Sequence, residues 1–255
     1  MIKRFFVTLY SFCAIGFGVV IFIPIVIVLS VTNLIGLRRM SNKLIYKIVK
    51  FASKIIVFGI GFKLFVSGQK NIPPRGKTGL CFVCNHSGIL DILLLLITAG
   101  RPLGFISKKE IVFVPFINLW LMLLGGIFMD RNNPRKALIA INNGIKKIKS
   151  GHSMAIFPEG TRSRGQGLLP FKTGSFRLAT AAGADIVPVA ISGTYDAFEK
   201  TGWVQPGPVC VSFGKAIETS GRPDGSETRQ YFSDQTRAEI DLLLKQQAKE
   251  HPPRP

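Results

Sequence analysis

The sequence predicts an α/β fold in which a largely parallel, mixed sheet is flanked by helices. Short β-prone stretches alternate with helical stretches, and polar residues follow several of the strands directly. The chain has 255 residues, of which 47% are hydrophobic, so it can bury a sizeable core. Such alternation is typical of parallel sheets covered by helices. We expect a membrane-associated helical pair before the α/β part.

Each predicted element follows from a local pattern. Short apolar, β-rich runs predict the strands, and helical stretches fall between most of them. The helix at 134–149 has Pro at its first turn and Gly151 after its end, and the helix at 174–182 is closed by Gly183. Leucine-rich residues 89–98 predict a third helix. The predicted strands are residues 63–67, 80–84, 103–107, 126–130, 154–157, 185–191 and 209–213.

The N-terminal part is predicted to associate with a membrane. Residues 5–37 carry no charge and are bracketed by Lys3-Arg4 and Arg38-Arg39. This segment either spans the bilayer once or dips in and returns. We favour the second, monotopic arrangement because Lys3 and Arg4 favour the cytoplasmic side and the helix that follows supplies a second membrane contact. Residues 41–58 form a basic amphipathic helix, for which lipid contact and ordinary packing on a core are alternatives. We therefore divide the chain into a membrane-associated part (1–60), an α/β domain (61–250) and a tail (251–255).

The charge balance favours lipid rather than nucleic acid as the partner. The net charge is +19, and no acidic residue precedes Asp91. The basic residues are interleaved with apolar ones and no nucleic-acid motif occurs, so anionic lipid headgroups and phosphorylated substrates are the expected partners. Neither G-x-G-x-x-G nor the Walker pattern is present, and no metal ligand set is evident, so we expect no cofactor or metal. Four scattered cysteines fit a reducing cytosol.

His86 and Asp91 are the first candidates for catalysis. They lie where strand 80–84 gives way, through Asn85-His86-Ser87-Gly88, to helix 89–98. On a continuous helix their side chains would point about 140° apart, so the pair can meet only if a loop carries His86. The Asp91 carboxylate can then orient one imidazole nitrogen and leave the other free as a base. With no obvious Ser or Cys nucleophile beside them, the activated hydroxyl is expected to belong to a substrate. The alternative is a chance pair, with Asp91 simply favoured by the helix dipole.

Candidate anion-binding residues follow other strands. Arg131 comes after strand 126–130, and Glu159, Gly160 and Arg162 come after strand 154–157. Arginine binds two phosphate oxygens at once, and Lys172 adds a third cation before the next helix. Ligands of such sheets sit beyond the carboxyl ends of strands. The alternative is that Glu159 pairs with Arg162, and Asp130 with a neighbour, in surface ion pairs.

The ordered set of motifs resembles the glycerolipid acyltransferase family, most closely its bacterial 1-acyl-glycerol-3-phosphate (lysophosphatidate) acyltransferases. Asn85, His86 and Asp91 match the Asn-His-x-x-x-x-Asp motif. The second motif resembles residues 125–131, Gly-Gly-Ile-Phe-Met-Asp-Arg, with Met129 where Ile is commoner. Residues 157–162 match Phe-Pro-Glu-Gly-Thr-Arg at every position, and 187–189 match Val-Pro-Val.

The resemblance implies acyl transfer from acyl-CoA or acyl-carrier-protein to the sn-2 hydroxyl of 1-acyl-glycerol-3-phosphate, giving phosphatidate in phospholipid biosynthesis. It implies His86 as the base and Asp91 as its orienter, with Arg131, Glu159, Gly160, Arg162 and Lys172 around the lysophosphatidate. A donor made in the cytosol places the domain on the cytoplasmic face of the inner membrane. Alternatives are another lysolipid or glycerol-3-phosphate as acceptor, and a non-catalytic lipid-binding relative. A metal-dependent hydrolase is disfavoured by the single His among carboxylates.

Overall fold

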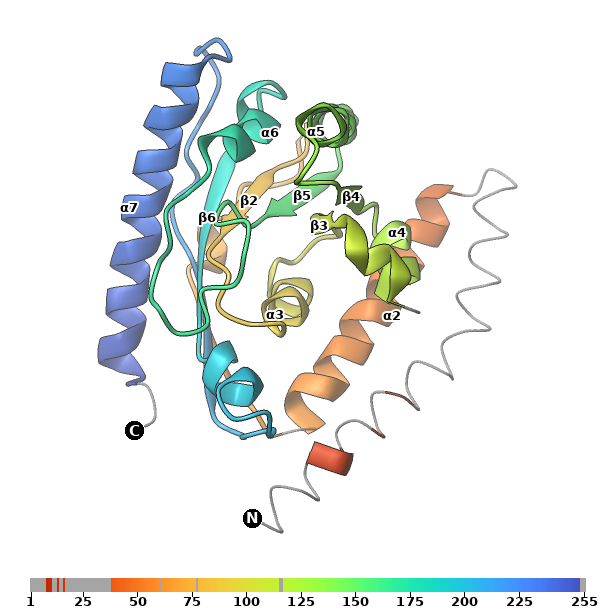
Figure 1. Cartoon of the computed structure of the whole chain (residues 1–255), viewed down its shortest axis with the longest axis vertical. Helices are drawn as coiled ribbons and strands as arrows, with labels where there is room; N and C mark the ends of the chain where they lie inside the picture. The colour runs from red at the N-terminus through yellow and green to blue at the C-terminus, as the bar shows by residue number, and fades with distance from the viewer. Residues whose placement is uncertain are drawn as a thin grey trace.

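The structure is a computed structural model that describes residues 8–10, 13, 16, 38–59, 61–76, 78–114 and 117–252. Within these residues the centre is a seven-stranded sheet with the order β1-β7-β6-β2-β5-β3-β4 (Figure 1). The strands are β1 (Lys63–Ser67), β2 (Cys81–Cys84), β3 (Leu103–Lys108), β4 (Ile127–Met129), β5 (Ser153–Ile156), β6 (Ile186–Ser192) and β7 (Pro208–Phe213).

The sheet is mostly parallel. Each neighbouring pair of strands runs in the same direction except β6 and β7, so β1 and β7 run against the other five. This confirms the expected largely parallel sheet, and each expected strand is present to within one residue at either end. The carboxyl ends of β2, β3, β4, β5 and β6 therefore meet at one edge, where ligands of such sheets bind.

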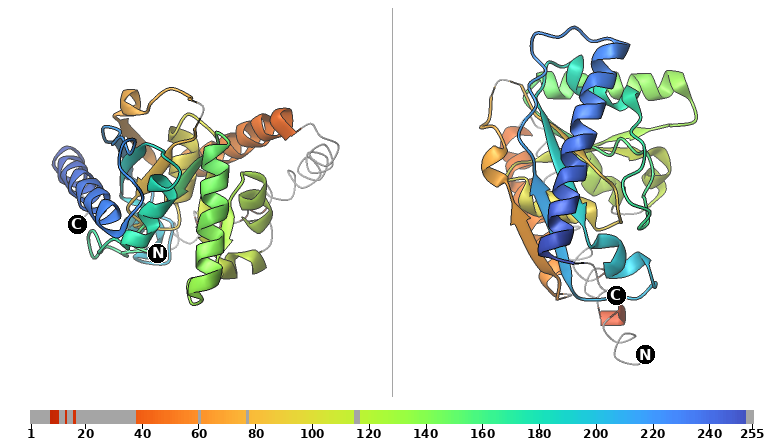
Figure 2. Two further views of the ribbon diagram at one scale, coloured as in Figure 1. Left: turned by 90° about the horizontal axis from the view of Figure 1, so that it is seen from above. Right: turned by 90° about the vertical axis from the view of Figure 1, so that its left-hand side faces the viewer.

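Helices cover both faces of the sheet, as the sequence predicts. α7 lies on the opposite side of the strands from α2 (Figure 2), α5 and α6 pack in the layer of α7, and α3 and α4 contact or neighbour α2. The helices are α2 (Arg38–Gly59), α3 (Asp91–Thr98), α4 (Ile117–Leu123), α5 (Pro134–Lys149), α6 (Arg177–Thr180) and α7 (Ser226–Glu250).

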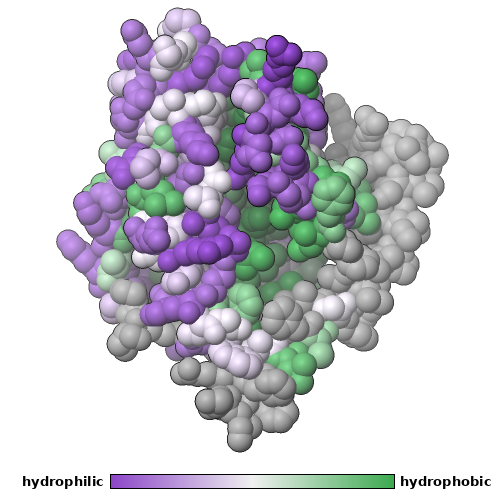
Figure 3. Space-filling model, viewed as in Figure 1, coloured by the Kyte–Doolittle hydropathy of each residue, from purple (hydrophilic) through white to green (hydrophobic). Residues whose placement is uncertain are grey.

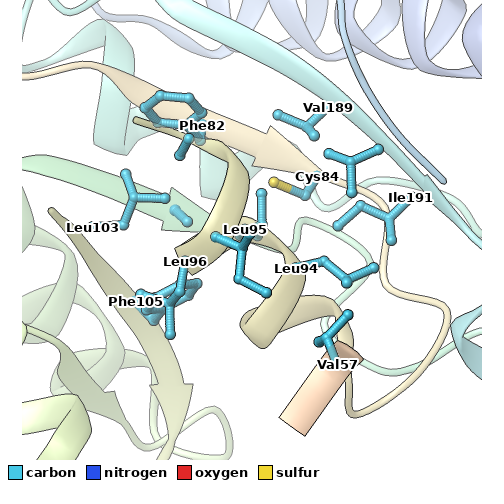
Figure 4. Packing of buried hydrophobic residues seen from close by; sticks show 14 of the residues in the cluster. Val57, Phe82, Cys84, Leu94, Leu95, Leu96, Leu103, Phe105, Val189 and Ile191 are labelled. Atoms are coloured by element: carbon cyan, nitrogen blue, oxygen red, sulfur yellow. The ribbon is translucent and has the colours of Figure 1, made fainter. Parts of the chain in front are cut away.

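Alternation along the strands divides the core in two. Phe82 and Cys84 of β2 pack with α2 and α3, whereas Cys81 and Val83 pack with α5, α6 and α7. Figure 4 shows the first of these clusters, with Val57 of α2 beside the leucines of α3. Successive side chains of a strand point to opposite faces, so Cys81 and Cys84 lie in different cores. Both are free thiols, and burial raises the pKa of Cys81 to about 12.

Local signals set α5 as predicted. Asn133 caps the helix by accepting a hydrogen bond from the Lys136 N–H, and Pro134 occupies the first turn. Two other helices differ from expectation. α3 begins at Asp91 rather than Ile89, because residues 88–90 form a turn. The stretch expected to be one helix, 174–182, is a 3-10 turn, η3 (Thr173–Phe176), followed by the single turn of α6.

α7 was not predicted from the sequence, although it has 25 residues and is the longest helix in the described part of the chain. Its buried positions are few, with Phe232 and Ile240 the main apolar ones. A helix with so narrow an apolar stripe gives a weak periodic signal, because most of its positions are polar.

α2 contains the expected helix 41–58 and packs on the core. Ile45, Val49 and Val57 are buried there, while Phe51 and Phe58 remain more than half exposed. The buried residues agree with packing on a core and the exposed ones with lipid contact, so both alternatives for this helix remain supported. In the part of the chain that the structure describes, no helix has the length and hydropathy needed to cross a membrane. The membrane segment expected at 5–37 lies almost wholly outside the described residues, as do residues 253–255 of the tail.

Candidate active site

The loop after β2 is fixed to the end of β6 by Asn85. The Asn85 side chain is buried, and its amide nitrogen donates to the carbonyl oxygen of Ile191 at 2.9 Å while its amide oxygen accepts from the Ile191 N–H at 2.7 Å. A side-chain amide used in both directions leaves neither group unsatisfied in the interior. The chain therefore leaves β2 in one defined direction, which sets the position of His86.

His86 and Asp91 meet as the sequence predicts. Nδ1 of His86 lies 2.7 Å from Oδ2 of Asp91, whose side chain is fully buried at the start of α3. The same oxygen accepts the backbone N–H groups of Ser87 at 2.8 Å and Gly88 at 3.0 Å. A carboxylate bonded to Nδ1 places the imidazole proton on Nδ1, which leaves Nε2 as the hydrogen-bond acceptor.

The His86 ring is held flat against Phe157. The two ring centroids are 4.1 Å apart and the planes are nearly parallel, at 21°. The His86 side chain is 18% exposed, and no described residue forms a hydrogen bond to Nε2. One nitrogen is thus fixed by Asp91 while the other is open to a partner, which is the geometry required of a general base.

Glu159 supports the same loop. It is 4% exposed, its Oε1 accepts the backbone N–H of His86 at 2.7 Å and its Oε2 accepts that of Leu169 at 3.3 Å. Burial raises the pKa of Glu159 to about 7, and the two backbone donors only partly oppose this rise. Glu159 is therefore a buried acceptor that holds residues 85–90, which we call the catalytic loop because they carry the candidate base His86.

Arg162 has a partner that the sequence did not indicate. Its guanidinium forms an ion pair with Glu199, which belongs to the π-helical turn η4 (Tyr195–Glu199) that follows β6. The other Glu199 oxygen accepts the N–H of Ile89 at 2.7 Å. The suggested pair of Glu159 with Arg162 is therefore wrong, because Arg162 is bound to Glu199 while Glu159 faces backbone N–H groups. The Arg162–Glu199 pair is therefore bound to the catalytic loop at Ile89.

Phe157 also lines a recess of about 360 Å³. Its apolar wall includes Ile106, Met129 and Ile156 of the sheet, together with Phe157 itself. Because Phe157 stacks on His86, the same side chain contacts the candidate base and lines the recess. The cations that line it are Arg131, Lys172, Arg177 and Arg229.

Arg131, Gly160 and Lys172 come together at this recess. The Arg131 guanidinium donates to the carbonyl oxygen of Gly160, and its buried Nε has no partner among the described residues. Burial lowers the pKa of Arg131. Gly160 has a φ of +72°, and a Cβ there would lie 2.9 Å from Nζ of Lys172. The left-handed backbone favours glycine in this turn, and the end of the Lys172 side chain lies close beside it.

The structure thus separates the seven predicted site residues into two groups. His86, Asp91, Glu159 and Arg162 belong to the catalytic loop and its supports, and the other three line the recess. Four further residues join the site from distant segments and were not predicted, because no local motif marks them: Thr194, Glu199, Arg177 and Arg229. Asp130 pairs with Lys109 at 2.8 Å, which agrees with the alternative in which Asp130 forms an ion pair with a neighbour. Within the described residues no group of three or more His, Cys, Asp or Glu side chains is arranged to hold a metal.

The fold and these motifs identify the class of protein. The family model described as Acyltransferase matches residues 63–192, which run from β1 to the end of β6 and include the catalytic loop and the residues of the recess up to Arg177. The match covers half of the chain, and the chain belongs to this acyltransferase family.

Individual relatives carry a more specific name. A 1-acyl-sn-glycerol-3-phosphate acyltransferase of Borreliella burgdorferi is 34% identical over 62% of this chain and 62% of its own length. The protein of that name from Haemophilus influenzae is 32% identical over 69% of this chain and 78% of its own. The crystal structure of the 1-acyl-sn-glycerophosphate acyltransferase PlsC from Thermotoga maritima matches 95% of this chain and 97% of that one, with a TM-score of 0.80 and 27% identity. The matches to the Borreliella and Salmonella typhimurium proteins span less than two thirds of those proteins.

Proposed function

We propose that this protein is a 1-acylglycerol-3-phosphate O-acyltransferase, which moves an acyl chain from acyl-CoA or acyl-carrier-protein to the sn-2 hydroxyl of lysophosphatidate and yields phosphatidate. The observation that carries the proposal is the free Nε2 of His86. The other ring nitrogen lies 2.7 Å from the buried Asp91, and the ring stacks on Phe157, which also lines a cationic recess. The names of its relatives support the same reaction.

The proposed reaction uses His86 twice. Nε2 takes the proton of the sn-2 hydroxyl as that oxygen attacks the thioester carbonyl carbon. The tetrahedral intermediate then collapses, the carbon–sulfur bond breaks, and the leaving thiolate takes the proton back from the imidazolium. Asp91 stabilises the imidazolium between these steps, because its carboxylate is bonded to the opposite nitrogen.

The acceptor phosphate is assigned to the recess. Arg131 and Lys172 line it, and the Nε–H of Arg131 is a buried donor that lacks an acceptor among the described residues. A buried donor without a partner is costly, and a phosphate oxygen would satisfy it. The glycerol carbon chain would then extend past Phe157 to the imidazole. Glu159 and Arg162 act in this proposal through the catalytic loop that they hold.

We further propose that the protein lies on the cytoplasmic face of an anionic membrane, with residues 1–60 making the main contact. α2 presents the exposed apolar side chains Leu44, Phe51, Ile55 and Phe58 among its lysines. A second apolar surface, the η2–α4 patch, comprises Val112, Phe113, Val114, Ile117 and Met122 of η2 (Lys109–Phe113), α4 and the residues between them. Hydrophobic residues gather over α4 and around a hollow in front of α3 (Figure 3). Apolar side chains beside lysines favour anionic lipid.

One assay tests the activity and the acceptor together. The full chain in detergent micelles is given one labelled acyl-CoA and, in separate reactions, lysophosphatidate, glycerol-3-phosphate, lysophosphatidylcholine and lysophosphatidylglycerol. We expect labelled phosphatidate from lysophosphatidate at a rate well above every other product. Faster acylation of another acceptor would refute the assignment, and no product from any acceptor with either acyl-CoA or acyl-carrier-protein would refute the activity.

A further inference from the structure

Both oxygens of the Asp91 carboxylate accept hydrogen bonds. Its Oδ2 accepts His86 Nδ1 and the backbone N–H groups of Ser87 and Gly88. Its Oδ1 accepts the hydroxyl of Thr194 at 2.6 Å, and Thr194 is fully buried, as is Asp91. Thr194 lies 103 residues further along the chain and belongs to none of the matched motifs.

The turn after β6 places Thr194 there. Gly193 has a φ of +83°, and a Cβ at this position would lie 2.3 Å from the carbonyl oxygen of Pro208, so the turn needs glycine. Gly88 of the catalytic loop packs directly on the same turn, since a Cβ at Gly88 would lie 3.0 Å from the carbonyl carbon of Thr194. The turn is thus locked against the loop, and the hydroxyl of Thr194 reaches the carboxylate from a rigid base.

The two oxygens of a carboxylate turn together about the terminal torsion of the side chain, which is broad when packing and hydrogen bonds do not restrict it. Donors on Oδ2 alone would leave Oδ1 without a partner in the interior, and a buried unpaired oxygen favours rotation toward another donor. A hydrogen bond donated to Oδ1 satisfies that oxygen, so rotation of the carboxylate would no longer gain a partner. The plane of the carboxylate is then fixed, and with it the direction of Oδ2 toward the imidazole.

We propose that Thr194 is a positioning residue for catalysis: its hydroxyl fixes the Asp91 carboxylate, and Asp91 in turn keeps Nε2 of His86 directed at the acceptor hydroxyl. This inference rests on the proposed acyl transfer. It assigns to the turn after β6 a function in the chemical step, which is separate from binding of either substrate.

The test compares Thr194→Val, which removes the hydroxyl at nearly constant volume, with Thr194→Ser, which keeps it. We expect Thr194→Val to lower kcat about tenfold or more, with KM for acceptor and donor changed by less than about twofold. Thr194→Ser should restore most of the loss. Thr194→Ala replaces the valine variant if that one does not fold. The matched control is Thr180→Val, because Thr180 is buried and donates a 2.6 Å bond to Asp224 rather than to Asp91. Its kcat per folded protein should stay near that of the wild type.

A second readout does not depend on turnover. The chain has three histidines, so the Nδ1–H proton of His86 can be assigned by NMR of histidine-labelled protein. We expect this resonance to shift and to exchange faster with water in Thr194→Val, but not in Thr180→Val. An unchanged kcat and resonance, a loss confined to KM, or a serine variant as poor as valine would overturn the inference. If the wild type acylates no acceptor while the resonance still responds, the proposed function fails and the positioning of the pair by Thr194 stands.

Discussion

Glu159 should make the stability of this protein fall as the pH rises through neutrality, and Glu159→Gln should abolish that dependence. The carboxyl has a pKa of about 7 when folded, against about 4.5 for an ordinary glutamate, because burial disfavours its charge. Between these pH values the folded protein keeps a proton that the unfolded chain releases. Stability from this group is therefore fully present below about pH 4.5 and is lost as the pH rises to about 7.

The size of the effect follows from the shift. At about 1.4 kcal/mol for each pH unit, the wild type should lose roughly 3 kcal/mol of unfolding free energy from Glu159 between pH 4.5 and pH 7. Glutamine has no titrating proton, and its amide oxygen can still accept the His86 N–H. The variant should therefore lack this slope, and its stability relative to the wild type should be greatest near pH 8.

The assay is urea unfolding in detergent micelles, followed by the fluorescence of Trp120 and Trp203, at several values from pH 5 to pH 8. Glu227→Gln is the matched control, because Glu227 is an exposed glutamate at the start of α7. Its unfolding free energy should follow the wild-type curve. Parallel curves for the wild type and Glu159→Gln would refute the reasoning, since they would mean that Glu159 is ionised across this range in the folded protein.

Three further predictions concern turnover and membrane contact. His86→Ala should abolish acyl transfer in a protein that still folds, and Asp91→Asn should lower kcat more than it raises KM for the acceptor. Arg131→Ala should raise KM for lysophosphatidate by about 10- to 100-fold and leave that for the donor nearly unchanged, because a charged hydrogen bond of about 1.5–3 kcal/mol is lost. Phe113→Ser should weaken binding to vesicles that contain anionic lipid, since the Phe113 side chain is 84% exposed at the centre of the η2–α4 patch.

Each of these three predictions has a control variant from the same chain. His152→Ala removes an exposed histidine before β5, Arg135→Ala removes an exposed arginine of α5, and Leu242→Ser removes an apolar side chain that is 61% exposed on α7. Circular dichroism, steady-state kinetics and vesicle co-sedimentation are the measurements. Wild-type turnover in His86→Ala, a donor-specific effect of Arg131→Ala, or equal loss of vesicle binding from Phe113→Ser and Leu242→Ser would contradict the assignments.

The sequence could predict elements and contacts that depend on local information. α5 carried its own signals, with Asn133 and Pro134 at one end and Gly151 after the other, and its bounds were predicted correctly. The His86–Asp91 contact spans five residues, so the geometry of one loop decides it. α7 lacked such information because its apolar residues are sparse, and packing on η3 and β6 determines where it lies.

Contacts between distant segments could not be predicted. Glu199 reaches the N–H of Ile89 across 110 residues, and Thr194 reaches Asp91 across 103. Nothing in the local sequence distinguishes Thr194 or Glu199 from an ordinary surface residue, because acidic and hydroxyl residues are common in turns. Arg162 illustrates the consequence: the nearest acid in sequence is Glu159, but the sheet brings Glu199 closer, and the ion pair forms with Glu199.

The hexapeptide after β5, residues 157–162, connects the base to the recess. Phe157 stacks on His86 and also lines the recess, and Gly160 gives its carbonyl oxygen to Arg131. Glu159, between them, accepts the N–H of His86. One turn therefore sets both the position of the proposed base and that of the proposed phosphate ligands, at a separation that the covalent chain fixes. A rigid separation suits an acceptor in which a short glycerol unit joins the phosphate to the reacting hydroxyl. Changes in this turn should therefore alter kcat and KM together, whereas changes at Thr194 or Arg131 should separate them.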